Sequence, residues 1–332
     1  MTSALLLSQA DIAALMTPAD YLDAVETGFR LNKLGRAPSP PPMHIPARAG
    51  AFHAKGAALD AARAVVAVKL NGNFPENRAL HGLPTIQGVI ILCDADNGAV
   101  LALMDSIEIT LRRTAAASAL AAKHLACADA SILAICGCGD QSYAHACALA
   151  DVVSVSKCIV WDTDADKVAA FAERAGALVG APIAVATSVG EATRSADIVV
   201  TCTTARAPFL TEADVKPGAF IAAVGADSPD KSELAPSLMK RAKIVVDVLD
   251  QCLVMGDLHH AVKAGAMTRD DVHADLGAIL LGEKPGRMRA DEIIVFDSTG
   301  AAFQDVASAA AVYARARNSD VGREFVLSAR NP

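Results

Sequence analysis

The stretch SILAICGCGDQS, residues 131–142, decides the fold of this chain. Its first half is apolar and rich in aliphatic side chains, which predicts a buried strand over Ser131–Cys136. The second half has the spacing G-x-G-x-x-S, with Gly137, Gly139 and Ser142, and a helical pattern follows it directly. In this setting the first glycine allows a tight turn, and the second lets the backbone approach a pyrophosphate at the helix N-terminus. The stretch therefore predicts a dinucleotide-binding loop, in which Ser142 replaces the usual third Gly or Ala.

An acidic residue comes at the end of the next predicted strand. Strand 158–161 ends in Trp161, and Asp162 follows it directly. A carboxylate at this position can accept hydrogen bonds from an adenosine ribose; the alternative is that it caps the following helix. The segment 162–166 contains three acids and no Arg, so a 2′-phosphate would meet repulsion without a partner. We therefore expect NAD rather than NADP as the cofactor.

Apolar strands alternate with helical segments through most of the chain after residue 131. The predicted strands cover residues 131–136, 158–161, 183–186, 198–202, 220–224, 244–248 and 293–296. This alternation is typical of a parallel sheet wound with helices. The fold class expected from it is α/β.

The first 125 residues have a different pattern. Thr17 followed by Pro18 predicts the start of a helix, because a Thr side chain can cap the first backbone N–H groups and Pro fits the first helical turn. Apolar residues then recur at helical spacing as far as Gly35. Asn97-Gly98 predicts a tight turn between two strands. The other expected elements are a loop over 38–46, strands over 65–70, 85–93 and 99–104, and a helix over 107–125. The last 30 residues have a helical pattern.

Composition excludes several classes of protein. The chain has 332 residues, of which 53% are hydrophobic, and a net charge of −7. This composition excludes wholesale disorder, and the absence of a Lys/Arg block argues against nucleic-acid binding. We expect no signal peptide and no membrane span. The eight Cys form no CxxC pair, and His259-His260 has no ligand pattern beside it, so we expect a cytoplasmic protein without a metal site.

Several segments together resemble the ornithine cyclodeaminase/μ-crystallin family, over nearly the whole chain. They are Ala67–Pro75 (AVKLNGNFP), Arg113–Ala116 (RTAA), Gly137–Gln141 (GCGDQ), Ala223–Pro229 (AVGADSP) and Phe296–Gly300 (FDSTG). The resemblance implies a homodimer in which a Rossmann-type dinucleotide-binding domain, residues 126–304, is inserted in an α+β dimerisation and substrate domain. That second domain would comprise residues 1–125 and 305–332.

The resemblance also assigns roles to individual residues. Lys69, on an apolar strand where a charge is costly, and Arg113, whose guanidinium can clamp a carboxylate, would bind the substrate carboxylate. Asp227 would face the substrate nitrogen and exchange a proton with it, and Thr85 would lie near the substrate. From the residues alone, Lys69 could instead extend to solvent, Asp227 could cap a turn, and Thr85 could be an ordinary strand residue. Arg112 is expected in a structural ion pair or in solvent.

The cofactor-binding set expected with this resemblance includes the glycine loop and residues at other strand ends. It consists of Thr114, Gly137, Gly139, Asp140, Gln141, Ser142, Asp162, Thr163, Cys202, Thr203, Val224, Gly225, Ser298 and Gly300.

The sequence departs from true ornithine cyclodeaminases in the strand over 50–56. Those enzymes have an acid there for the distal ammonium of the substrate, whereas this chain has His53 in the matching position and Lys55 two residues on. The family's early carboxylate-binding Arg is also missing from the run Pro42-Met43-His44. If His53 and Lys55 face the substrate rather than solvent, they would repel a distal ammonium and suit a second carboxylate or a small 2-imino acid.

The expected function is an NAD(H)-dependent oxidoreductase acting on a small 2-amino or 2-imino acid, either an imine reductase or an amino-acid dehydrogenase. One alternative is an ornithine cyclodeaminase-type ammonia-lyase that uses NAD catalytically. The other is a crystallin-like protein that binds nucleotide or ligand without catalysis.

Overall fold

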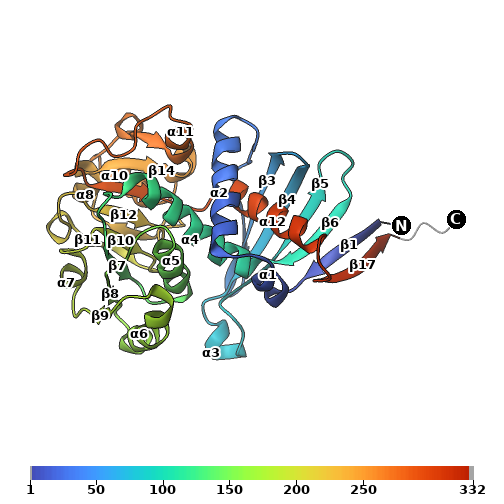
Figure 1. The fold of residues 1–332 in the computed structure, drawn as a ribbon, viewed down its shortest axis with the longest axis horizontal. Coiled ribbons are helices and arrows are strands. Elements are labelled where there is room, and N and C mark those ends of the chain that lie inside the picture. Colours follow the sequence, from blue (N-terminus) through green and yellow to red (C-terminus); the bar gives the residue numbers. More distant parts are fainter. Residues whose placement is uncertain (1, 329–332) are drawn as a thin grey trace. The chain divides into compact units, whose positions relative to one another are not determined.

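The computed structural model describes residues 2–328 and divides into two compact units (Figure 1). The first unit runs to Arg113 and resumes at Ala302, and the second is the continuous stretch Thr114–Ala301. The predicted assignment of substrate and cofactor domains to residues 1–125 with 305–332 and 126–304 stays a prediction. Helix α4 (Ser106–Leu125) contributes residues to both units.

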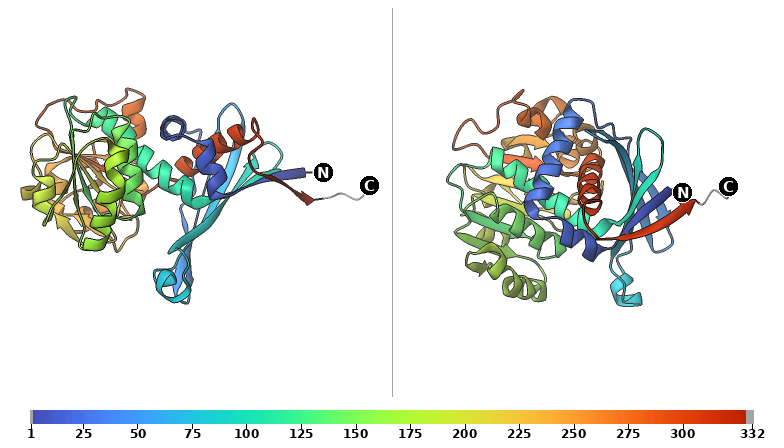
Figure 2. Two further views of the ribbon diagram at one scale, coloured as in Figure 1. Left: turned by 60° about the horizontal axis from the view of Figure 1, so that its bottom comes forward. Right: turned by 45° about the vertical axis from the view of Figure 1, so that its right-hand side comes forward.

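The first unit is built on a mixed seven-stranded sheet with the order β17-β1-β6-β5-β4-β3-β2. Its strands are β1 (Thr2–Leu7), β2 (Met43–Ala47), β3 (Gly50–Asp60), β4 (Ala64–Asn73), β5 (Ile86–Asp94), β6 (Val100–Asp105) and β17 (Arg323–Ser328). Its helices are α1 (Gln9–Leu15), α2 (Pro18–Lys33), α3 (Asn77–His81) and α12 (Ala302–Ala316). Helix α12 packs against α2, β3 and β4, and Figure 2 shows α2 and α12 on the same face of the sheet.

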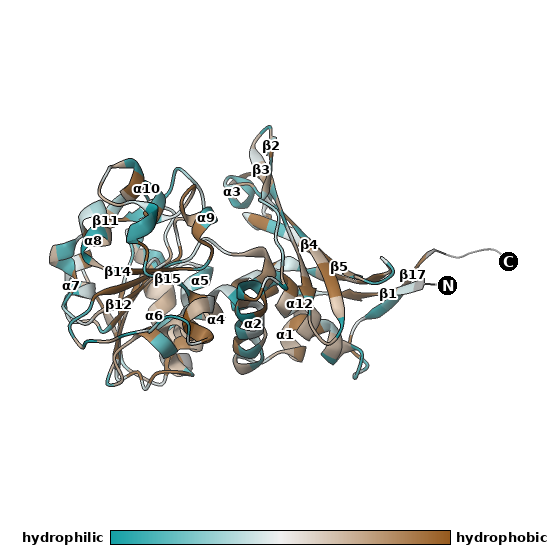
Figure 3. Ribbon diagram, turned by 90° about the horizontal axis from the view of Figure 1, so that it is seen from above, coloured by the Kyte–Doolittle hydropathy of each residue, from teal (hydrophilic) through white to brown (hydrophobic). Residues whose placement is uncertain are grey.

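Strand β4 has apolar side chains on both of its faces. Ala67 and Lys69 lie on the buried face, whereas Val66, Val68 and Leu70 are 36%, 44% and 38% exposed. Side chains alternate between faces along a strand, so the exposed residues of β4 share one face, and the hydrophobic colour along β4 and β5 is visible in Figure 3. The sheet therefore has one covered face and one apolar face that is exposed in the single chain.

The second unit contains an eight-stranded parallel sheet with the order β15-β14-β16-β12-β10-β7-β8-β9. Its strands are β7 (Ile132–Cys136), β8 (Lys157–Trp161), β9 (Ile183–Val185), β10 (Ile198–Thr201), β12 (Phe220–Ala223), β14 (Lys243–Val246), β15 (Ala274–Asp275) and β16 (Ile294–Asp297). A separate parallel pair consists of β11 (Arg206–Leu210) and β13 (Ser232–Leu234). From β9 to β12 the order β9-β8-β7-β10-β12 is that of the doubly wound dinucleotide-binding fold, which confirms the predicted α/β class.

Helices connect these strands. They are α5 (Asp140–Ala150), α6 (Ala165–Val179), α7 (Val189–Thr193), α8 (Pro236–Arg241), α9 (Leu249–Cys252), α10 (Asp257–Lys263) and α11 (Leu276–Leu280), with short 3₁₀ turns η1 (Glu212–Asp214) and η2 (Arg269–Asp271). The core of the unit consists of fully buried strand residues such as Val199, Ile221 and Ile244. Such near-continuous apolar strands are expected where both faces of a parallel sheet are covered.

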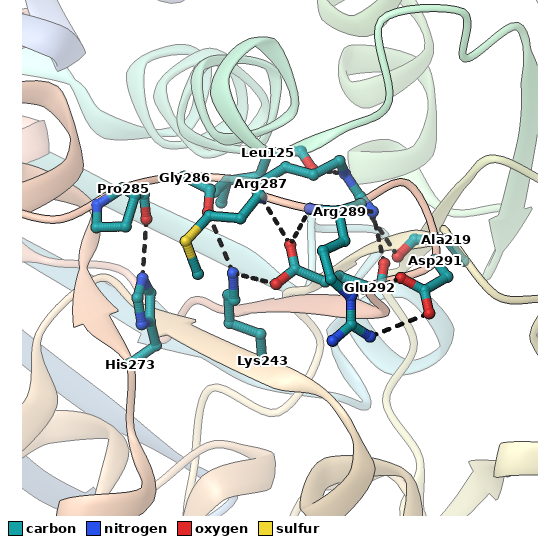
Figure 4. A network of polar contacts seen from close by, with 11 residues as sticks. Leu125, Ala219, Lys243, His273, Pro285, Gly286, Arg287, Arg289, Asp291 and Glu292 are labelled. Atoms are coloured by element: carbon teal, nitrogen blue, oxygen red, sulfur yellow. Dashed lines mark hydrogen bonds and ion pairs between the residues drawn. The ribbon is translucent and has the colours of Figure 1, made fainter.

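A polar network anchors the loop that precedes β16 (Figure 4). Lys243 forms an ion pair with Glu292 at 2.5 Å, and the Arg287 guanidinium donates hydrogen bonds to the carbonyl oxygens of Leu125 and Glu292. His273 contacts the carbonyl oxygen of Pro285. Lys243 begins β14 and Glu292 precedes β16, so the network lies at the amino ends of these strands. It secures the edge opposite the one where doubly wound folds bind ligands.

Two segments form strands where the sequence predicts a loop or a helix. Residues 38–46 were expected to form a loop, and the last 30 residues were expected to be helical. Instead, Met43–Ala47 pairs antiparallel with β3, and the chain leaves α12 at Ala316 and forms β17, which pairs with β1. Backbone pairing overrides the local signals in both places, with the neighbouring strand β3 for β2 and with a strand from the other end of the chain for β17.

Candidate functional site

The glycine loop between β7 and α5 has the geometry that the sequence predicts. Gly137 adopts a φ of 101°, and a Cβ there would lie 2.9 Å from the carbonyl oxygen of Cys202, so no larger residue fits. Gly139 precedes α5 as its N-cap, and a Cβ there would meet no atom within 4 Å. The space next to Gly139, at the N-terminus of α5, fits the pyrophosphate of a dinucleotide.

Asp162 holds the glycine loop from the end of β8. Its carboxylate accepts hydrogen bonds from the backbone N–H of Cys138 at 2.8 Å and of Asp164 at 3.0 Å, and from the Thr163 hydroxyl. The side chain that caps α6 is Asp164, which accepts from the N–H groups of Asp166 and Lys167. The alternative that Asp162 serves as the helix cap is therefore wrong.

Helix α5 is fixed by buried polar contacts. The Ser142 hydroxyl donates to the Gly139 carbonyl, and Ser142 is fully buried, so only a small residue fits at the third position of the motif. The His145 ring contacts the Gln141 carbonyl at 2.8 Å and the Ser118 hydroxyl at 3.0 Å. Burial lowers the pKa of His145 to about 4, so the ring is neutral. Asp140 begins the helix in an exposed position.

The predicted cofactor residues on β10 and β12 lie at the carboxyl ends of adjacent parallel strands. Cys202 and Thr203 follow β10, and Val224 and Gly225 follow β12. A buried carboxylate that was not predicted, Glu233 on β13, accepts hydrogen bonds from the N–H of Thr203 and of Gly225. It thereby joins the ends of the two strands.

A second unpredicted carboxylate organises the loop after β16. Asp247 accepts hydrogen bonds from the N–H groups of Thr299 at 2.8 Å and Gly300 at 2.7 Å, and from the Ser298 hydroxyl at 3.2 Å. Gly300 has a φ of 80°. Ser298 and Gly300, both predicted cofactor residues, are thus held in place by the carboxylate at the end of β14. Thr114, the remaining member of the predicted set, lies within α4.

Lys69 and Arg113 share one buried carboxylate in the first unit. Lys69 Nζ lies 2.6 Å from Asp305 Oδ2, and Arg113 Nε lies 2.8 Å from Asp305 Oδ1. The guanidinium also donates to Gln304 Oε1 at 3.1 Å, and the ammonium donates to the Thr110 hydroxyl at 3.3 Å. All three charged side chains are 5% exposed or less. We call Lys69, Arg113, Asp305 and Gln304 the cationic cluster.

The charges of the cationic cluster do not balance. Burial and the nearby cations Arg113 and Lys55 lower the pKa of Lys69 to about 7, although Asp305 acts in the opposite direction. Burial alone would raise the pKa of Asp305, but the charges of Arg113 and Lys69 outweigh it and lower that pKa. With Lys69 protonated, two cations share one anion in a buried place. Such a site favours a further anion, such as the carboxylate of a small acid.

The two strand residues that distinguish this chain from cyclodeaminases lie on the same sheet face as Lys69. Lys55 is directly opposite Lys69 in the β3–β4 pair, and His53 is opposite Asn71, so their side chains share that face. Both are half-buried rather than fully exposed. The His53 ring also lies 4.8 Å from the ring of His44, centroid to centroid.

The other predicted substrate residues have ordinary surroundings. Asp227 is 56% exposed and forms an ion pair with Lys231 at 2.6 Å. Thr85 precedes β5 and its carbonyl accepts from Phe74 N–H. Arg112 forms an ion pair with Glu108 at 2.8 Å, as expected for a structural pair.

Sequence reasoning missed Asp305, Gln304, Glu233 and Asp247. A signal for the first two exists, because Gln304-Asp305 is a polar pair near the start of an otherwise Ala- and Val-rich helix. A polar pair in such a segment is costly to bury unless it has partners. Glu233 has no comparable local signal, since it lies in an ordinary polar loop sequence.

Within residues 2–328, no helix is long and apolar enough to cross a bilayer. The same residues contain no group of three or more His, Cys, Asp or Glu side chains suited to a metal ion.

A doubly wound sheet, a glycine loop at a helix N-terminus and an acid after the second strand define a dinucleotide-binding protein of the Rossmann class. The sequence profile of the ornithine cyclodeaminase/mu-crystallin family matches residues 2–320, and the chain belongs to that family.

Solved structures of similar chains include three bound to nicotinamide cofactors. An archaeal alanine dehydrogenase dimer with bound NAD is 36% identical, covers 98% of this chain and all of its own, and has a TM-score of 0.93. The Δ¹-pyrroline-2-carboxylate reductase of Thermococcus litoralis, solved with NADH and L-proline, is 33% identical over 96% of this chain and 99% of its own, with a TM-score of 0.92. The iminosuccinate reductase of Paracoccus denitrificans with NAD⁺ is 33% identical over 98% of this chain and 100% of its own, also at 0.92.

Proposed function

We propose that this protein is an NAD(H)-dependent oxidoreductase that acts on the carbon–nitrogen bond of a small 2-amino or 2-imino acid. The observation that carries the proposal is the cationic cluster, in which the buried cations Lys69 and Arg113 share the single carboxylate of Asp305. The similar enzymes solved with NAD or NADH support the cofactor. When bound, NAD accepts a hydride from the amino acid, and NADH returns one to the imine.

The cationic cluster would bind the α-carboxylate of the substrate. Arg113 uses Nε and Nη1 for Asp305 and Gln304, and its remaining N–H donors suit a carboxylate oxygen. Lys69 would add a point charge beside the reacting carbon. Asp227 would hold the substrate nitrogen and exchange a proton with it. For Asp227 this role is an inference from the family motif AVGADSP, since in the single chain its carboxylate pairs with Lys231.

The finer choice of substrate rests on Lys55 and His53. Both lie on the Lys69 face of the sheet, where they would repel a distal ammonium and attract a second carboxylate. An iminodicarboxylate is therefore a better candidate than a diamino acid. Thr85 stays a candidate contact for the same substrate.

The proposal is tested by following NADH oxidation with 2-oxo acids and ammonia. The panel contains oxaloacetate as a dicarboxylate, pyruvate as a monocarboxylate, and Δ¹-pyrroline-2-carboxylate as a cyclic imine. We expect turnover with at least one of them, and loss of that turnover in Lys69→Met. A Lys55→Met variant should lower kcat/KM for the dicarboxylate more than for pyruvate. No NADH oxidation with any of the three would reject the proposed function.

Cyclodeamination remains the alternative within the family. It is tested by incubating the protein with NAD and L-ornithine and measuring proline and ammonia, with no net NADH expected. Efficient turnover would contradict the role given to Lys55 and His53. A crystallin-like binding protein would leave NADH oxidation undetectable while still binding the nucleotide.

We further propose a homodimer formed through the exposed face of the seven-stranded sheet. The face carries exposed apolar side chains on neighbouring strands, namely Met43, Ile45, Phe52, Val68, Leu70 and Ile91. Patches of this kind usually mark an interface, and the similar archaeal alanine dehydrogenase is a dimer. Light scattering should give twice the chain mass, and Val68→Glu should give monomers, whereas Leu34→Glu, at an exposed apolar position on another element, should not.

A cytoplasmic location is also part of the proposal. All eight Cys, which lie between residues 93 and 252, carry free thiols, as expected in a reducing compartment.

A further inference from the structure

Glu233 is a fully buried acid at the edge of the sheet where the cofactor loops lie. It lies on β13 and is 0% exposed. Its own N–H donates to Asp257 at 2.8 Å, which fixes its backbone. A buried carboxylate without a partnering cation is costly, so its hydrogen bonds must compensate.

Both oxygens of the Glu233 carboxylate are used, and each faces one backbone N–H. Oε1 accepts from Thr203 N–H and from the Thr203 hydroxyl, both at 2.7 Å. Oε2 accepts from Gly225 N–H at 2.9 Å and from the Thr201 hydroxyl at 2.7 Å. Only a carboxylate can accept at both places, because an amide would turn its NH₂ toward one of the two N–H donors.

One of the two segments that Glu233 joins packs on the glycine loop. A Cβ at Gly225 would lie 2.4 Å from Glu233 Oε1, so only a glycine at this position leaves room for the carboxylate. A Cβ at Gly137 would lie 3.0 Å from Thr203 Cγ2, so the segment fixed by Glu233 in turn packs on the glycine loop. Strands β10 and β12 belong to the second half of the doubly wound sheet, the half that receives the nicotinamide side of a dinucleotide.

We propose that Glu233 is a positioning residue for the nicotinamide half of the cofactor: its carboxylate holds the ends of β10 and β12 in the conformation that binds NAD(H). This inference rests on the proposed function, since it requires NADH as a ligand. Glu233 acts through Thr203 and Gly225 and touches no reacting atom.

The experiment compares Glu233→Gln with the wild type by calorimetric titration of two ligands, NADH and ADP. ADP contains only the adenosine and pyrophosphate part, which the β7–β8 half would bind. The Kd of NADH should rise about tenfold, as expected for one lost buried hydrogen bond to a charged group, while the Kd of ADP should stay within about twofold of the wild type. A merely structural role would weaken both ligands equally.

A matched control comes from the opposite edge of the same sheet. Asp197 precedes β10, and its carboxylate also accepts two backbone N–H groups, those of Ser131 and Ile132. Asp197→Asn should lower the Tm and leave the ratio of the two Kd values unchanged. Thr201→Val removes only one hydroxyl donor from Glu233 and serves if Glu233→Gln does not fold; it should raise the Kd of NADH about threefold.

The outcomes separate the two proposals. A wild-type protein that does not bind NADH would overturn the proposed function and this inference with it. Wild-type binding of NADH, with Kd ratios in Glu233→Gln and Thr201→Val equal to that of Asp197→Asn, would overturn the role of Glu233 alone.

Discussion

The two units each contain a buried polar cluster, and the clusters differ in what surrounds their carboxylates. In the first unit, Asp305 is paired with the side-chain cations Lys69 and Arg113. In the second unit, Glu233 and Asp247 accept hydrogen bonds from backbone N–H groups and hydroxyls. The first arrangement has an excess of positive charge and can take another anion. The second has its acceptors satisfied from its own loops, so it shapes the backbone instead of binding a charged ligand.

The strongest test of the difference is Lys69→Met. If the cationic cluster binds the substrate carboxylate, kcat/KM for the imino acid should fall by about 10²–10³-fold, as for the loss of one charged donor in an active site. Steady-state NADH oxidation measures it. Lys240→Met, at a site 58% exposed, should retain wild-type kcat/KM, and an equal loss in both variants would contradict the assignment.

The second test removes the anion of the cationic cluster. Asp305→Asn leaves the buried Lys69 and Arg113 without their shared partner, so the free energy of unfolding should fall by about 3–5 kcal/mol near pH 6. Lys69 has a lower pKa in the folded protein than when unfolded, and this variant lowers it further. Above this lowered pKa the folded variant binds fewer protons than the unfolded chain, so the stability lost at low pH should be regained as the pH rises. Urea unfolding at pH 6 and pH 9 checks this, and a loss independent of pH would argue against a charged Lys69.

The third test is the pH dependence of kcat/KM in the wild type. Burial and the nearby cations Arg113 and Lys55 lower the pKa of Lys69 to about 7. A substrate carboxylate would bind to the protonated form of Lys69. Above that value, kcat/KM should fall by about tenfold per pH unit. If kcat/KM instead rises through this pH range, Lys69 acts as a base, and the cationic cluster does not bind the substrate as a pair of cations.

The smallest expected effect concerns Asp162, which like Glu233 accepts from a backbone N–H. Asp162→Ser should raise the KM for NADH about tenfold, through the loss of that hydrogen bond and of the ribose acceptor. The preference for NADH over NADPH should shrink by a similar factor. Initial rates with NADH and with NADPH measure this preference. If the ratio of the two rates is unchanged, Asp162 only holds the glycine loop and does not bind the ribose.

The parts of the fold that local signals encode were predictable. The strand–turn–helix of residues 131–142 and the cap at Thr17 depend on neighbours in sequence, and the structure has both. The ion pair between Arg113 and Asp305 joins residues 192 positions apart, and no periodicity reports such a pairing. Likewise, β17 pairs with β1 near the other end of the chain, and the local sequence of β17 does not report that partner.

The interrupted course of the first unit has a consequence for how the protein is made. Residues 114–301 are one continuous stretch, so this part has its whole core once it has left the ribosome. Helix α12, which packs on α2, β3 and β4, is synthesised after them and after the whole second unit. Until then Lys69 and Arg113 have no Asp305 beside them. Domains usually fold in the order of synthesis; here the middle of the chain can fold before its beginning.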